Sequence, residues 1–185
     1  MGREVRRVPP NWEHPRHTEE TAPDISWIGE HKPCYDETYE NAALEWMKGL
    51  DSWRAGTHPG FSDRDGVEFF WDWEGMPPDE GYYLPEFNED PTWYQLYETV
   101  SEGTPVSPPF PALEGLARYL ADNGDFWYQK DKRAVRSTFR TKPSYEQALA
   151  MVNQGWAASM AMVGGKMLEP HEQALHIKTE RESES

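Results

Sequence analysis

The stretch from Trp93 to Asn123 constrains the fold more tightly than any other part of the chain. Residues 93–100, WYQLYETV, form an aromatic and β-branched run with side chains on two alternating faces, which predicts a β-strand. A tight turn at 101–103 follows, because the glycine at its end can adopt a positive φ. The chain then returns in extended form over 104–107, where Pro105 has no N–H group to donate to a sheet. The sequence therefore predicts an antiparallel pair whose second strand lies at a sheet edge.

Three segments carry apolar residues at helical spacing, and each is followed by a glycine. They are 35–54, 112–122 and 144–154, and the last begins with a capping box formed by Ser144 and Gln147. With the strand, they predict the α+β class: a single small domain in which about three helices pack on a small antiparallel sheet, with long proline-rich and acidic loops. The inward positions are Tyr35, Tyr39, Ala42, Trp46, Leu50 and Trp53, then Leu113, Leu116, Ala117 and Leu120, then Tyr145, Ala148, Leu149 and Val152.

Pattern and composition divide the chain into three parts. Residues 1–34 hold five prolines and predict an extended arm. Residues 35–177 are expected to form the α+β domain, which includes a hairpin between strands at 157–163 and 166–168. Residues 178–185, KTERESES, are polar throughout and predict a disordered tail.

The chain is strongly acidic, with 33 Asp and Glu against 18 Lys and Arg and a formal net charge of −15. A field of this sign repels nucleic acid and anionic membranes and favours a basic protein partner. The acidic residues concentrate in 61–90, which holds ten Asp and Glu and one basic residue, Arg64. We expect a long ordered loop there. Within it, Val67 to Trp73 (VEFFWDW) predicts either a short strand or an aromatic plug.

A mean hydropathy of −0.90 is low for a compact protein, but nine Trp, nine Tyr and seven Phe can supply a modest core. A single cysteine, Cys34, excludes an intramolecular disulfide, which suits a reducing cytosol. No apolar run approaches the ~20 residues of a membrane span, and the basic N-terminal stretch lacks the apolar region of a signal peptide. We therefore expect a cytoplasmic protein that makes no membrane contact.

Histidine motifs near the beginning of the chain raise the question of a metal site. His14 and His17, and then His31 and Cys34, are spaced like the two halves of a zinc knuckle. Structural zinc sites generally hold more cysteines, and a proline restricts each turn, so we predict no metal and no other cofactor. Cys34 would act as a nucleophile only with a base such as His31 or His58 beside it, and a structural cysteine is the simpler interpretation.

Other catalytic patterns are incomplete. His171 and His176 resemble a zinc-protease pair, but a spacing of five residues places them on diverging sides of a helix. Residues 63–66 (DRDG) are not followed by the twelve-residue ligand pattern of a calcium loop. Paired carboxylates beside Trp71 and Trp73 would suit glycoside cleavage, yet any acidic chain offers such pairs. Because no nucleotide-binding or serine-hydrolase motif is present, we expect no enzymatic activity and assign no catalytic residue.

The segment 125–143 is locally basic, with six Lys and Arg against two Asp. With Trp127, Tyr128 and Phe139 it could contact phosphate. We favour the interpretation that it neutralises the acidic residues of 61–90 within the same molecule. Since exposed ion pairs contribute only about 0–1 kcal/mol each, the aromatic side chains would have to stabilise that contact.

Four stretches carry a family resemblance: GREVRRVPPNWEHP (2–15), KPCYDETYENAALEW (32–46), YETVSEGTPVSPPFPALEGLARYLADNG (97–124) and SYEQALAMVNQGWAASM (144–160). They resemble a family of small tailed-bacteriophage and prophage proteins, most of unknown function. The resemblance implies a phage origin and transfers no catalytic residue. It also implies an apolar residue at the position of Cys34, which would make this cysteine a small buried hydrophobe.

The charge and the resemblance together lead to a hypothesis about function. We expect a phage-encoded accessory protein that acts in the host cytoplasm by protein–protein contacts with a basic host or phage protein. One variant of this hypothesis is an inhibitor of host defence that imitates DNA with ordered carboxylates. The alternatives are a minor virion or assembly component, whose proline-rich arms would clamp its neighbours, and a small hydrolase.

The candidate binding face consists of Trp71, Asp72, Trp73 and Glu74. Carboxylates would speed the encounter with a basic partner, and a tryptophan would supply a desolvated anchor. The alternative is that both tryptophans fill the core of the domain itself.

Overall fold

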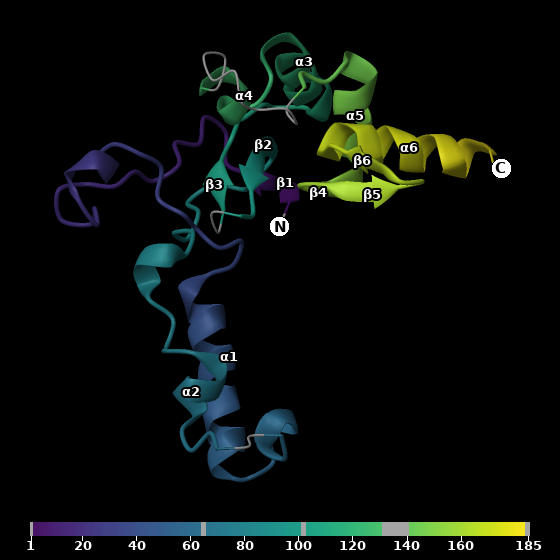
Figure 1. Ribbon diagram of the computed structural model, residues 1–185. Coiled ribbons are helices and arrows are strands. Elements are labelled where there is room, and N and C mark those ends of the chain that lie inside the picture. Colours follow the sequence, from purple (N-terminus) through teal and green to yellow (C-terminus); the bar gives the residue numbers. More distant parts are fainter. Residues whose placement is uncertain (1, 64–65, 101–102, 131–140, 184–185) are drawn as a thin grey trace. The chain divides into compact units, whose positions relative to one another are not determined.

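The computed structural model describes residues 2–63, 66–100, 103–130 and 141–183. It combines helices with antiparallel strands, so the predicted α+β class is confirmed (Figure 1). Contacts between Cα atoms divide the chain into two compact units. Met1–Lys32 together with Phe87–Ser185 is called the sheet unit below, and Pro33–Glu86 is called the acidic unit.

The sheet unit is built on a four-stranded antiparallel sheet. Its strands are β1 (Gly2–Val8), β2 (Trp93–Glu98), β3 (Thr104–Pro105) and β4 (Trp156–Ala158), in the order β3-β2-β1-β4 (Figure 1). In the register, Val5 faces Leu96 and Arg3 faces both Glu98 and Ala157. The strand predicted at 93–100 is confirmed over Trp93–Glu98, and the edge position of the strand that follows it is confirmed.

The interior position of β1 differs from the extended arm predicted for residues 1–34. Its sequence, GREVRRV, holds three basic residues and one acidic residue, a composition that does not suggest a strand inside a sheet. The structure nevertheless buries Arg3 and Arg6. The guanidinium of Arg3 pairs with Glu98, and that of Arg6 lies 4.5 Å from the centre of the Tyr97 ring. Partners for the buried charges therefore allow this strand to lie inside the sheet.

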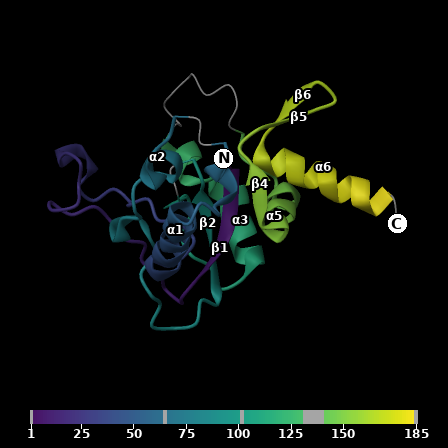
Figure 2. The same ribbon diagram turned by 90° about the horizontal axis from the view of Figure 1, so that it is seen from below.

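Helices pack beside this sheet and close the larger of two hydrophobic clusters. α3 (Leu113–Asn123) contacts β2 and lies beside α5 (Tyr145–Gln154), which contacts β4 and α6 (Pro170–Ser183) (Figure 2). α4 (Phe126–Lys130) is a short helix after α3. The capping box of Ser144 and Gln147 is confirmed, and so is the core position of Leu116. The buried members of the cluster are Leu96, Val106, Leu116, Ala117, Leu120, Ala148, Met151, Val152, Ala157 and Ala174.

The last third of the chain departs from the prediction at two places. β5 (Ala161–Val163) and β6 (Lys166–Leu168) form the predicted hairpin, but Ala157 and Ala158 belong to β4 in the main sheet. The segment predicted to be a disordered tail from residue 178 is helical as far as Ser183. Ion pairs of Lys178 with Glu146 and Glu182 support this helix, and a compositional prediction of disorder takes no account of such pairs.

The acidic unit consists of one long helix and several short ones. α1 (Tyr39–Arg54) begins after Thr38, whose hydroxyl accepts a hydrogen bond from the Asn41 amide, so the helix starts later than residue 35. It is followed by η2 (Pro59–Phe61), α2 (Phe70–Glu74) and η3 (Glu80–Tyr82). A further short helix of the sheet unit, η1 (Ile25–Trp27), precedes this segment.

The acidic unit has a hydrophobic cluster of its own. Leu50, Trp53 and Phe70 are its buried members, and Trp46, Phe61 and Val67 pack against them. The inward residues of α1 therefore pack on Phe70, whereas α3 and α5 pack on the main sheet. Trp46, predicted to be a core residue, is only partly buried, and its indole N–H donates to the Gly75 carbonyl.

The segment Val67 to Trp73 is not a strand, because α2 begins at Phe70. It does provide an aromatic plug, and the residue that plugs the cluster is Phe70. Three predictions involve positions outside the described residues: the turn at 101–102, the middle of the DRDG motif at 64–65 and most of the basic segment, 131–140. Among the described residues, no helix is both long enough and apolar enough to cross a membrane.

Candidate functional site

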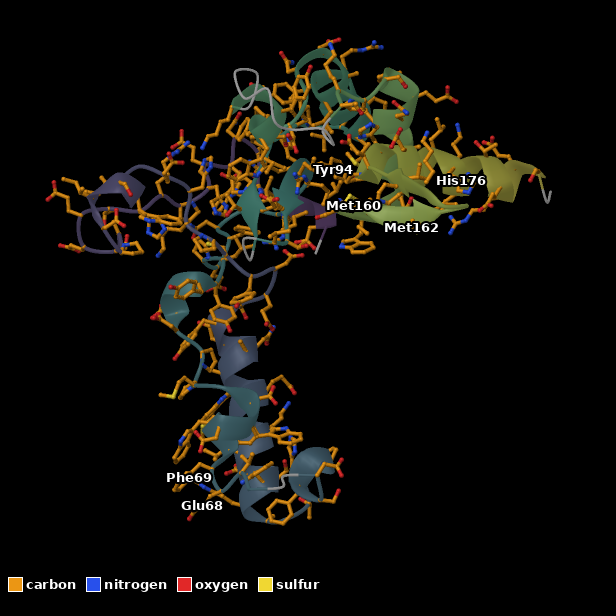
Figure 3. The ribbon with its side chains drawn as sticks, viewed as in Figure 1. Glu68, Phe69, Tyr94, Met160, Met162 and His176 are labelled. Atoms are coloured by element: carbon orange, nitrogen blue, oxygen red, sulfur yellow. The ribbon has the colours of Figure 1, made fainter. Side chains whose placement is uncertain are left out.

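The four residues predicted to form a binding face come together on the outside of the acidic unit. Phe70, the first residue of α2, points into the cluster and is 2% exposed. On either side of it, Phe69 and Trp71 remain 44% and 40% exposed, and their rings stack with centroids 4.8 Å apart and planes 6° apart. Figure 3 shows Phe69 and Glu68 on the outer side of the unit. Phe70 thus fixes a short helix whose neighbouring rings face solvent.

Trp73 has a mixed role. Its ring lies 5.9 Å from that of Trp53 and against Gly60, where a Cβ atom would meet the indole at 2.4 Å. It is still 39% exposed. Trp73 therefore packs partly against the hydrophobic cluster, as the alternative interpretation expected, whereas Trp71 does not.

Carboxylates surround these rings. Asp72 and Glu74 are exposed, and in the described part of the chain neither forms an ion pair. The acidic unit holds thirteen Asp and Glu against three Lys and Arg, a formal charge of −10 out of the −15 of the whole chain. We call Glu68, Phe69, Trp71, Asp72, Trp73 and Glu74 the acidic aromatic surface.

A hollow of about 650 Å³ borders this surface within the acidic unit. Trp46, Phe70 and Tyr83 are its aromatic lining residues, and Glu74 and Met76 also line it. Met76 is 76% exposed, which is unusual for a large apolar side chain. The surface therefore combines protruding rings with a recess that a partner side chain could enter.

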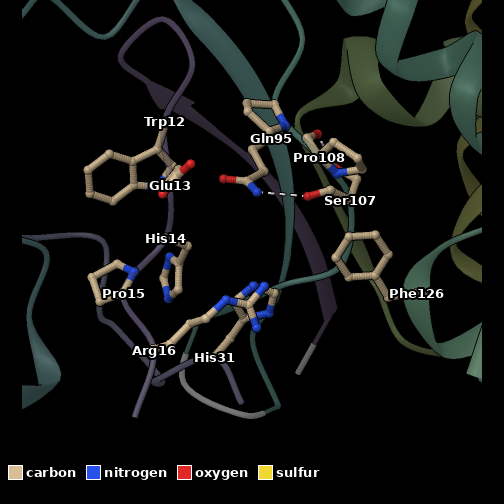
Figure 4. A pocket seen from close by; sticks show the side chains of 11 residues that line it. Trp12, Glu13, His14, Pro15, Arg16, His31, Gln95, Ser107, Pro108 and Phe126 are labelled. Atoms are coloured by element: carbon tan, nitrogen blue, oxygen red, sulfur yellow. Dashed lines mark hydrogen bonds between the residues drawn. The ribbon is translucent and has the colours of Figure 1, made fainter. Parts of the chain in front are cut away.

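A second candidate site lies in the sheet unit, where a cavity of about 610 Å³ opens beside β2 (Figure 4). Five segments that are separate in the sequence supply its walls. Its lining residues are Trp12, Glu13, His14, Pro15, Arg16, His31, Gln95, Ser107, Pro108, Pro109 and Phe126.

A chain of hydrogen bonds runs behind the wall of this cavity. The Trp12 indole N–H donates to the hydroxyl of Tyr97 at 3.2 Å, and that hydroxyl donates to Gln95 Oε1 at 2.9 Å. Gln95 Nε2 in turn donates to the Ser107 carbonyl at 2.7 Å (Figure 4). Tyr97 and Gln95 are both buried, so this chain fixes the wall in place.

The two histidines of the cavity are perturbed by their surroundings. Burial, with the nearby cations Arg6 and Arg16, lowers the pKa of His14 to about 4. Burial and the charges of Arg16 and Lys130 lower the pKa of His31 to about 4 as well. Both imidazoles are therefore neutral near pH 7.

The hydrogen bonds of His14 indicate its tautomer. Its Nε2 lies 2.7 Å from the Lys32 carbonyl oxygen, an atom that only accepts, so Nε2 carries the proton. Nδ1 is then unprotonated and lies 3.2 Å from the Tyr97 hydroxyl, whose single proton is donated to Gln95 Oε1. The His31 ring packs edge-on to His14 and parallel to Phe126, with centroids 5.7 Å and 6.3 Å away.

The sequence marks His14 and His31 as possible zinc ligands, and His31 also as a possible base for Cys34. Among the described residues, no group of three or more His, Cys, Asp and Glu is arranged to hold a metal ion. Cys34 is buried, as expected for a small hydrophobe, and belongs to the acidic unit. One sequence feature points to a polar site near this strand. Gln95 is a polar residue between two aromatic residues on one face of the predicted strand.

The remaining candidates do not assemble into catalytic sites. His171 is buried against Thr141 and Glu169, and burial lowers its pKa, whereas His176 pairs with Glu180. His58 accepts a hydrogen bond from the Gly60 amide and packs against Trp53.

No protein-family model matches the chain, and no match was found among curated proteins or solved structures.

Proposed function

We propose that this chain is a protein-binding accessory protein that docks on a basic partner through its acidic aromatic surface. The observation that supports this most directly is the stacked pair of Phe69 and Trp71, which remains exposed while the residue between them is buried. A helix of five residues that buries one ring and exposes the rings on both sides is poorly explained by stability alone. The resemblance to phage proteins supports a setting in the host cytoplasm.

The arrangement suits the energetics of an interface. Tryptophan is enriched at positions where truncation costs 2 kcal/mol or more of binding free energy, because a rigid ring displaces much water at little entropic cost. Stacking against Phe69 and anchoring by Phe70 hold Trp71 in place before a partner arrives. The net charge of −10 on the acidic unit would raise the association rate with a basic partner, and salt would lower that rate.

The first test is the removal of the Trp71 ring. The full-length chain is immobilised, exposed to a bacterial host lysate, and the proteins that it retains are purified for kinetic measurement. Trp71→Ala should weaken binding of a retained basic protein by about 2 kcal/mol, roughly thirtyfold in Kd. Trp156→Ala in β4 is the matched control, since Trp156 is 48% exposed in the sheet unit and should leave Kd unchanged. Equal affinities for both variants would contradict the proposal.

The second test separates charge from the ring. Asp72→Asn combined with Glu74→Gln keeps the shape of α2 and removes two carboxylates. Association with the same partner should slow severalfold at low ionic strength, and the difference should fade in high salt. An unchanged dissociation rate would show that the two carboxylates act on the association step alone. If association rates are equal at low salt, the acidic aromatic surface is not the binding face.

A further inference from the structure

The cavity beside β2 continues into a second hollow of different character. That hollow has a volume of about 550 Å³ and shares Arg16, His31 and Phe126 with the first. Trp27, Val106 and Trp127 are among its other walls. Together the two hollows form a recess in the sheet unit that is polar at one end and apolar at the other, and we call it the double recess.

The apolar end suits a planar hydrophobic group. The indole rings of Trp27 and Trp127 and the phenyl ring of Phe126 line it together with Pro105 and Val106, both buried. Small-molecule sites are typically concave, about 300–1,000 Å³ in volume, and lined by aromatic side chains with a few polar groups. Each half of the double recess lies within that range.

The junction between the halves offers hydrogen-bond donors to an anion. Arg16 uses one guanidinium N–H to bind the Gly29 carbonyl at 2.6 Å, and in the described part of the chain its other N–H groups donate to no protein atom. His31 lies beside it, and within the same residues its ring nitrogens form no hydrogen bond. Lys130 pairs with Glu30 at 3.4 Å, whereas Arg16 forms no ion pair with a carboxylate among the residues that the structure describes.

We propose that the double recess binds an aromatic carboxylate, with the ring between Trp27, Phe126 and Trp127 and the carboxylate on Arg16 and His31. A guanidinium fits a carboxylate in a bidentate geometry, and a neutral imidazole adds one N–H donor. This site is distinct from the acidic aromatic surface, so each can be tested without the other.

The local electrostatics agree with this assignment. Arg6 and Arg16 lower the pKa of His14, and Arg16 and Lys130 lower that of His31, so three cations act on the recess. The one carboxylate that opposes them at His31 is Glu30. Glu13 and Glu30 also line the recess, and Arg16 is the cation that acts on both histidines, so the attraction for an anion is local to Arg16.

Calorimetric titration of the full-length chain provides the test. N-acetyl-tryptophan carries the carboxylate, and N-acetyl-tryptophanamide is the uncharged analogue of the same shape. The acid should bind at least tenfold more tightly than the amide. Arg16→Gln should remove that preference, while Arg54→Gln, an exposed arginine paired with Asp51 in the acidic unit, should preserve it.

A short peptide that ends in tryptophan distinguishes the two sources of the ligand. Binding of both the free acid and the peptide indicates a site for a protein C-terminus, and binding of the acid only indicates a small metabolite. Equal binding of acid and amide, no binding of any probe at millimolar concentration, or an Arg16→Gln chain that keeps the preference would each overturn the proposal. Because Arg16 is exposed, its replacement should leave the thermal unfolding temperature unchanged, which confirms that a loss of binding is local.

Discussion

Arg3 is the residue on which the interior strand of the sheet unit depends most. Its guanidinium binds Glu98 Oε1 at 2.9 Å and Asp125 Oδ2 at 3.0 Å. The second oxygen of Glu98 accepts a hydrogen bond from the Trp127 indole, and Asp125 also caps the backbone amide of Tyr128. One buried cation thus ties β1 to β2 and to α4.

Arg3→Leu should cost about 3–5 kcal/mol in the free energy of unfolding, because it removes the Arg3 guanidinium from the buried Glu98 carboxylate. Arg7→Leu is the control on the same strand, since Arg7 is exposed and lies over the Tyr94 ring. It should cost no more than about 1 kcal/mol. Urea unfolding measures both, and similar midpoints for the two variants would show that the ion pairs do not stabilise the strand.

The depressed pKa of His14 links stability to pH. In the unfolded chain this imidazole titrates near 6.5, and in the folded chain at about 4. The unfolded state therefore binds more protons between these values, so the free energy of unfolding falls as the pH falls from 6.5 towards 4. His31 and His171 act in the same direction.

His14→Gln should flatten this pH dependence. Urea unfolding at pH 4.5, 5.5, 6.5 and 7.5 gives the slope for each chain, and the slope of the variant between pH 4.5 and 6.5 should be smaller by up to about 1 kcal/mol per pH unit. Carboxylates titrate equally in both chains, so the difference isolates the imidazole. An unchanged slope would mean that His14 is protonated as readily in the folded state as in the unfolded state.

At the scale of elements, local sequence patterns predicted what local forces determine. α3 and α5 follow from leucine and alanine spacing and from the Ser144 capping box, and β2 follows from its aromatic alternation. β1 was missed because its position depends on Glu98 and Asp125, which lie far away in the sequence. α2 was missed because it is short and exists through the fit of Phe70 against α1.

A glycine in α1 tests that fit. Glycine within a helix normally costs about 1 kcal/mol relative to alanine, so Gly→Ala is expected to stabilise. A Cβ atom at Gly49, however, would lie 2.5 Å from the Phe70 ring, which is buried and cannot withdraw freely. Gly49→Ala should therefore destabilise the acidic unit by about 1–3 kcal/mol.

Gly115 in α3 is the matched control for Gly49. Its Cβ atom would find its nearest neighbour, in Phe110, at 3.4 Å, which is ordinary contact. Gly115→Ala should raise the free energy of unfolding by up to about 1 kcal/mol. Thermal denaturation of both variants gives the comparison, and stabilisation by Gly49→Ala would show that Phe70 does not pack tightly on α1.

At the scale of the molecule, two hydrophobic clusters serve two units. The smaller cluster has three buried members, Leu50, Trp53 and Phe70, and belongs wholly to the acidic unit. We therefore expect unfolding to depart from a single two-state transition. Leu50→Ala should lower the free energy of unfolding for one transition by about 2–5 kcal/mol. Leu116→Ala should lower that of the other transition by a similar amount. Calorimetry in which both variants shift the same single peak would contradict this.

The two candidate sites differ in how far the sequence could predict them. Trp71, Asp72, Trp73 and Glu74 are contiguous, so the sequence alone keeps them close together, but only the structure shows how far each is exposed. The double recess could not be predicted, since its walls come from distant segments that only the sheet and its connections bring together. Trp12 and His31 have no shared pattern in the sequence that would mark them as neighbours.

Because β1 lies between β2 and β4, synthesis on the ribosome separates the two units in time. The acidic unit has all its residues within Pro33–Glu86 and can fold as soon as that segment emerges. The strand Gly2–Val8 is made before both of its partners and waits with unpaired backbone groups until Trp93–Glu98 and then Trp156–Ala158 follow. An apolar strand would aggregate during such a delay. We expect the three arginines of β1 to lower this tendency by repulsion between copies, so that charges which stabilise the finished sheet also protect the unpaired strand.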